Sequence, residues 1–166
     1  MFLNELKEKF EKSNIECALK QPGEGAPFER LLAVLPTDMK PQPIMELMFL
    51  PGLEDEVEDA RLLQMFVTLG QNIPNNRRAD LIRFMTHINV YLPLPAFGFL
   101  ATNGLFFHKY VLAISKSNFQ NDKKVLTELY YLTSYLIDKY FPYFNALVAG
   151  EISLEEAIKA TQVNVG

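Results

Sequence analysis

Histidine and cysteine are the side chains of this sequence best suited to bind a transition metal, and the chain holds Cys17, His87 and His108. A structural zinc site takes about four such ligands at short, regular spacings. These residues lie far apart in the sequence, so their spacing disfavours a metal site. We expect His87 on the surface of a helix, and His108 on a strand opposite Phe99 with one ring nitrogen hydrogen-bonded.

Carboxylates are densest between residues 54 and 59. Oxygen ligands of this kind suit Ca²⁺. The run nevertheless lacks the Asp-x-Asn/Asp-x-Asn/Asp-Gly loop and the later Glu that complete a calcium site. A solvated acidic loop is therefore the favoured interpretation of these residues: Glu54, Asp55, Glu56, Glu58 and Asp59.

Motifs of nucleophilic catalysis and phosphate binding are missing from the sequence. It has no Gly-x-Ser-x-Gly elbow, no Gly-x-x-x-x-Gly-Lys-Ser/Thr loop and no Gly-x-Gly-x-x-Gly fingerprint. Arg77 and Arg78 together suggest an anion site only weakly, and solvated surface arginines are the favoured interpretation. We therefore expect a protein that is not an enzyme and that holds no cofactor or metal.

Length and charge narrow the classes of partner. A chain of 166 residues, 49% of them hydrophobic, is long enough for one domain and short for two, which predicts a single domain over residues 1–166. A net charge of −4 disfavours nucleic acid and anionic lipid as partners. The N-terminus lacks a signal-peptide pattern, no apolar stretch is long enough to span a membrane, and one cysteine fits a reducing compartment. These features predict a cytoplasmic protein with no membrane partner.

Hydrophobic periodicity predicts the elements that position these side chains. A kink or break is expected at Pro142 in the longest helix, and Ser153 with Glu156 forms a capping box that opens a short tail. The predicted fold is α+β, in the order α-β-β-β-α-β-β-α, with an antiparallel sheet packed by helices and a short C-terminal helical tail. Helices are predicted within 1–13, 74–92, 121–150 and 150–160, and strands within 29–36, 43–50, 61–69 and the hairpin 97–111.

The hairpin segment reads FGFLATNGLFFHKYV. Asn103-Gly104 between two apolar runs favours a two-residue type I′ turn, in which both residues have positive φ. Such a turn places Leu100 opposite Phe107. Because side chains alternate across a strand, one face of the hairpin then carries Gly98, Leu100, Thr102, Leu105, Phe107, Lys109 and Val111.

These patterns together resemble the YbjN family, whose fold is similar to that of type III secretion chaperones. The shared features are a helix leading into a hairpin with Gly104 at the turn, a long helix ending in Tyr140-Phe141-Pro142, then Gly150 and a Ser-Leu-Glu-Glu-Ala tail from Ser153. The resemblance spans about residues 1–160. It implies a dimerising α+β domain without catalytic residues, which acts as a regulator or as a chaperone-like binder of protein segments.

One face of the hairpin departs from the family pattern. Positions equivalent to Leu105, Phe107 and Val111 tend to be polar in the family, whereas here Lys109 is the charged residue of that strand. We therefore predict a protein-binding face made of Leu100, Leu105, Phe107, Lys109 and Val111. It would pack on a second copy of the chain, giving a homodimer, or on a client protein or peptide.

Two alternatives to this interface stay open at the level of sequence. In the first, the tail helix or a loop of the same chain covers the apolar face. In the second, the chain is a small-ligand binder or an enzyme with an aromatic-lined cavity between sheet and helices. The polar groups of that cavity would be Tyr110, Tyr130, Tyr140 and His108.

Overall fold

The computed structural model describes residues 2–23, 26–52, 57–117 and 120–162. Its centre is a six-stranded antiparallel sheet in the order β1-β2-β3-β4-β6-β5. More buried and more exposed side chains alternate along Arg30–Val34, Ile44–Phe49 and Ala60–Gly70, as expected where one face of a sheet meets the core. The strands are β1 (Cys17–Lys20), β2 (Arg30–Val34), β3 (Ile44–Phe49), β4 (Ala60–Gly70), β5 (Phe97–Leu100) and β6 (Leu105–Ser115).

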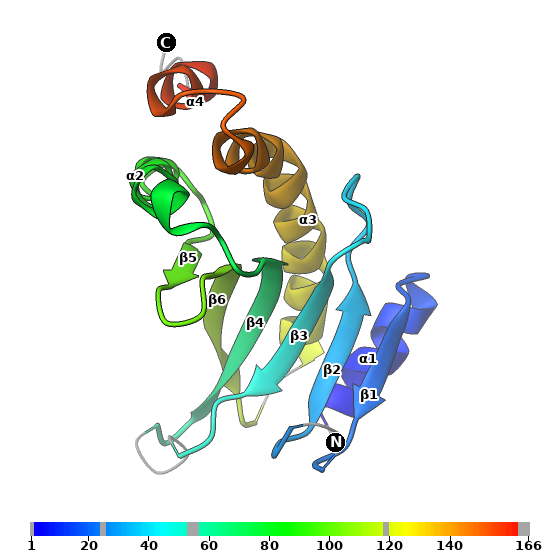
Figure 1. Ribbon diagram of the computed structural model, residues 1–166. Helices are drawn as coiled ribbons and strands as arrows, with labels where there is room; N and C mark the ends of the chain where they lie inside the picture. The colour runs from blue at the N-terminus through cyan, green and yellow to red at the C-terminus, as the bar shows by residue number, and fades with distance from the viewer. Residues whose placement is uncertain (1, 24–25, 53–56, 118–119, 163–166) are drawn as a thin grey trace.

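The helices are α1 (Phe2–Lys12), α2 (Asn75–Asn89), α3 (Gln120–Ala149) and α4 (Leu154–Thr161). In Figure 1, α1 and α3 lie behind the sheet, on the same side of it. The other two helices lie at the end of the molecule beside β5, where α4 contacts both α2 and α3. The molecule therefore has two layers, with helices against one face of the sheet.

Aromatic side chains join the helices to the sheet. The ring of Phe144 on α3 lies 4.8 Å from Phe84 on α2, 4.9 Å from Phe97 on β5 and 4.7 Å from Phe106 on β6, measured between centroids. Nearer the other end of α3, Phe10 of α1 packs on Tyr130 at 5.4 Å. One continuous hydrophobic core results.

The α+β class, the antiparallel sheet and the short helical tail are confirmed. The structure adds β1 as an edge strand; its four residues are too few to give a clear alternation in the sequence. The expected capping box is present, since Ser153 accepts a hydrogen bond from the Glu156 amide and the Glu156 carboxylate accepts one from Ser153. Helix α3 continues through Pro142, so no break occurs there.

The hairpin between β5 and β6 has a longer turn than predicted. Of the two expected turn residues, Gly104 has a positive φ of 62°, and the connection is the four-residue loop 101–104. Two contacts hold this loop: Arg78 Nη1 in the first turn of α2 donates to the Ala101 carbonyl at 3.1 Å, and the amide of Ile73, just before α2, donates to the Gly104 carbonyl at 3.2 Å. These tertiary contacts favour a loop over the predicted type I′ turn.

The longer turn shifts the hairpin register by two residues. His108 lies opposite Phe97 rather than Phe99, and Leu100 lies opposite Leu105 rather than Phe107. A shift of two keeps every side chain on its original face, because the side-chain period of a strand is two residues. The predicted membership of the two hairpin faces is therefore unchanged for the residues within the strands.

Candidate protein-binding face

The sheet face turned away from α1 and α3 is the candidate site, and we call it the open face. It is the face toward the viewer in Figure 1, and no helix of the described chain lies over it there. None of its residues is fully buried, whereas Leu31, Met45 and Val67 on the opposite face are 0% exposed. Its central residues are Arg30, Leu32, Val34, Ile44, Glu46, Met48, Leu62, Gln64, Phe66, Thr68, Gly98, Leu100, Leu105, Phe107, Lys109, Val111 and Ala113.

The structure brings the predicted binding residues together on the open face. Leu100 is 47% exposed and Lys109 is also exposed. Leu105, Phe107 and Val111 are half-buried. They form the β5–β6 side of a surface that continues over β4, β3 and β2.

The sequence analysis placed only hairpin residues on the binding face and missed the apolar residues on β2, β3 and β4. Glu46, Gln64 and Thr68 give these strands a polar appearance on that face, but each of them has an apolar neighbour two residues away. Examining every second residue along these three strands, at the even-numbered positions, would have revealed these apolar side chains. The missed residues are Leu32, Val34, Ile44, Met48, Leu62 and Phe66.

Two aromatic rings flatten part of the open face. Phe66 and Phe107 stack with centroids 4.9 Å apart and an interplanar angle of 27°. The Phe107 ring also covers Gly98, where an added Cβ would lie 2.3 Å from ring atoms. The glycine thus leaves room for the ring to lie against the sheet, which leaves a broad apolar surface at this point.

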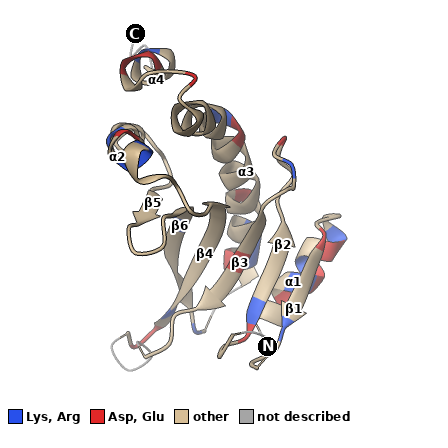
Figure 2. Cartoon of the chain, viewed as in Figure 1, with Lys and Arg blue, Asp and Glu red and all other residues tan. Residues whose placement is uncertain are grey.

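Charged groups on the open face are few and lie at defined positions. Arg30 Nη1 lies 2.9 Å from Glu46 Oε2 across β2 and β3, and the side chain of Glu46 keeps 36% of its exposure. Lys109 is two strands away from Glu46. Figure 2 shows both signs of charge gathered on α1 and few charged residues along the strands.

The described part of the tail does not cover the open face. Helix α4 packs against α2 and α3, and Figure 1 places it beyond the end of the sheet. Its capped start follows Gly150, whose positive φ of 80° turns the chain away from α3. Residues 154–161 therefore do not cover the open face, as the first alternative from the sequence would require of the tail helix.

The aromatic groups of the alternative ligand cavity are used in core packing. Tyr130 is 2% exposed and its hydroxyl donates to the Val34 carbonyl. Burial raises the pKa of this hydroxyl to about 12. Tyr140 and His108 pack around Phe97. A surface cleft of about 440 Å³ lies elsewhere, between loop 39–43, the end of β4 and α3.

Arg77 and Arg78 are half-buried rather than solvated, which corrects the expectation from sequence. Arg78 Nε donates to the Ile73 carbonyl at 2.8 Å, besides its bond to the hairpin loop. Arg77 lies against Gly150, where an added Cβ would be 2.2 Å from its Nη2 atom. Arg78 therefore ties the start of α2 to the hairpin loop, and Arg77 packs against the turn that follows α3.

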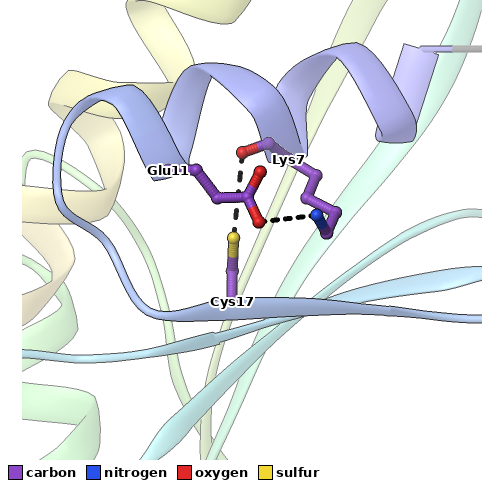
Figure 3. A network of polar contacts seen from close by, with 3 residues as sticks. All are labelled: Lys7, Glu11 and Cys17. Carbon is purple, nitrogen blue, oxygen red and sulfur yellow. Dashed lines mark hydrogen bonds and ion pairs between the residues drawn. The ribbon is translucent and has the colours of Figure 1, made fainter.

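Cys17 belongs to the contact between α1 and β1 (Figure 3). Its Sγ lies 3.8 Å from the Lys7 carbonyl, and Lys7 Nζ pairs with Glu11 at 2.6 Å on the same helix. Burial, followed by the nearby Glu11 carboxylate, raises the pKa of the thiol. A raised pKa lowers the thiolate fraction, so this cysteine is poorly suited to nucleophilic chemistry.

His108 is 1% exposed. Its Nε2 lies 3.3 Å from the Leu94 carbonyl, and because a carbonyl only accepts, Nε2 carries the proton of the neutral ring. Burial lowers the pKa of the imidazole, and the bond to Leu94 opposes this in part.

Acidification is expected to destabilise the fold through His108. Its pKa is lower in the folded state, so above pH about 6.5 the ring is neutral in both states, and below it the unfolded chain takes up the proton first. The free energy of unfolding from urea titrations should therefore fall below pH about 6.5 more steeply for the wild type than for His108→Leu. If the free energy of unfolding of the two proteins changed with pH in the same way, His108 would not be the cause of the acid destabilisation.

Residues 2–23, 26–52, 57–117 and 120–162 contain no cluster of metal ligands and no membrane-spanning helix. Within them, no three His, Cys, Asp or Glu side chains cluster closely enough to hold a metal ion. No helix there is both long and apolar enough to cross a bilayer. Part of the acidic run, Glu54–Glu56, lies outside the described residues.

Comparison with known proteins gave no relative. No protein-family model, curated protein or solved structure matches the chain. The physical character of the open face is therefore the main indication of what this chain does.

Proposed function

We propose that this chain is a non-enzymatic protein-binding module, chaperone-like or regulatory, that acts as a homodimer in the cytoplasm. The observation that carries the proposal is the open face: a sheet surface with apolar side chains on every strand from β2 to β6 and no described helix over it. Contiguous apolar surface of this kind marks an interaction site. Each large apolar side chain that becomes fully buried contributes roughly 1.5–3 kcal/mol, before the cost of association.

The resemblance of the sequence to the YbjN family also favours this function. That family implies a dimerising domain that binds protein segments, and a dimer would leave surfaces outside the interface for a client. The acidic net charge of −4 makes nucleic acid a poor partner.

Phe107→Glu tests the proposal. The wild type is expected to elute from gel filtration with a light-scattering mass near twice 19.0 kDa. The variant should be a folded monomer, because a carboxylate buried among the apolar side chains of the interface loses its hydration without gaining a partner. Far-UV circular dichroism shows whether the variant is folded.

Tyr135→Glu is the matched control, since Tyr135 is an aromatic residue, 58% exposed, on α3 and away from the open face. This control should remain a dimer. A wild-type monomer at all concentrations, or a Phe107→Glu dimer as stable as the control, would refute the proposed function.

A further inference from the structure

A single row of side chains across the open face carries opposite charges on either side of β4. The strand register places Leu32, Glu46, Phe66 and Lys109 directly opposite one another in turn, on β2, β3, β4 and β6. Neighbouring strands are about 4.8 Å apart, so Glu46 and Lys109 each lie about 5 Å from the line of β4, on opposite sides. The row is apolar at Phe66, negative at Glu46, whose carboxylate also pairs with Arg30 of the same chain, and positive at Lys109.

We propose that two copies pack open face to open face, with a two-fold axis that runs parallel to β4 between the two sheets. This inference rests on the proposed function and specifies its geometry. Rotation about that axis places β4 over β4 of the second copy and β3 over its β6. Glu46 of each copy then faces Lys109 of the other, and the two Phe66 rings meet at the centre.

The charges distinguish this arrangement from the other simple aligned one. An axis at right angles to the strands, along the row itself, would place Glu46 over Glu46 and Lys109 over Lys109 of the second copy. Like charges facing one another across an interface are unfavourable. Aligned packing of two sheets is a common geometry of sandwiches, with a small angle that follows from the twist of the strands.

Neighbouring rows are compatible with the same axis. Thr68 pairs with Phe107, and Val34 pairs with Ile44, in the row on one side. Rotation about β4 therefore brings Ile44, which is 48% exposed, over Phe107 of the second copy. In the row on the other side, Met48 and Val111 flank Gln64. The same rotation brings Met48 of each copy over Val111 of the other. Apolar groups thus face apolar groups, while Glu46 and Lys109 each face the opposite charge and Arg30 keeps its pair with Glu46 of the same chain.

Charge reversal tests the geometry. Lys109→Glu should raise the dissociation constant of the dimer about tenfold or more, because the introduced carboxylate would face Glu46 of the second copy. The triple variant Arg30→Glu, Glu46→Lys, Lys109→Glu reverses the charges of the network and keeps each pair, including the one between positions 30 and 46. It should return the dissociation constant, measured by analytical ultracentrifugation, toward the wild-type value.

Mixing two variants with complementary charges provides a second test of the geometry, which does not require the triple variant to fold. Lys109→Glu chains and Arg30→Glu, Glu46→Lys chains each repel their own copies in this geometry, but they complement one another. Native mass spectrometry of the mixture should show heterodimers in excess over either homodimer. Lys139→Glu, at an exposed position on α3, is the control for a general effect of charge and should leave the wild-type constant unchanged.

The outcomes separate this geometry from the function that underlies it. If the wild type is a dimer and Phe107→Glu a monomer, but Lys109→Glu dimerises normally or the mixture shows no excess of heterodimer, the axis is wrong and the binding face stands. If the wild type is a monomer, both proposals fail.

Discussion

Phe144→Ala should lower the free energy of unfolding by about 3–5 kcal/mol. Phe144 is 1% exposed and its ring touches Phe84, Phe97 and Phe106, so it joins α3 to α2 and to both strands of the hairpin. Truncation removes apolar contact and leaves a cavity that three separate elements would have to close together. Urea denaturation followed by circular dichroism, at one protein concentration, measures the change.

Tyr135→Ala is the control on the same helix. Its side chain is 58% exposed, and surface substitutions of this kind usually change stability by less than about 0.5 kcal/mol. A loss below about 1 kcal/mol for Phe144→Ala would show that the aromatic cluster does not hold the layers together.

Glu5→Leu is expected to cost about 3 kcal/mol of stability, from a different physical cause. Lys123 Nζ lies 2.5 Å from Glu5 Oε2, with 10% of the lysine side chain and 28% of the glutamate side chain exposed. The pair links α1 to the first turn of α3. Removing the carboxylate takes this counter-charge away from a largely buried ammonium group, whereas replacing both partners by apolar residues is often nearly neutral.

The double variant Glu5→Leu, Lys123→Met should therefore recover most of the stability that Glu5→Leu loses. Glu8→Leu, on the exposed side of α1, is the matched control and should change little. Thermal and urea denaturation of the four proteins gives the comparison. Equal effects of Glu5→Leu and Glu8→Leu would contradict the structural role of the ion pair.

Local patterns in the sequence predicted much of this fold, because they depend on residues close together in the chain. Helical spacing of apolar residues predicted α1 and α3, and alternation predicted β2, β3 and β4. The capping box at Ser153 is a contact between residues three apart, and the structure confirms it. Edge strand β1 escaped this reasoning because it is short and is defined by its partner β2.

Alternation along the chain also determined which hairpin residues share a face, and the structure keeps Leu100, Phe107 and Lys109 on one side despite the change in register. The tertiary structure alone decided the register of the hairpin and which face of the sheet is covered by helices. Contacts from Arg78 and Ile73 set the turn, and the packing of α1, α3 and α4 leaves the open face without a helix. The physical reason is that face membership follows from the two-residue period of a strand, whereas cover depends on contacts between segments far apart in sequence.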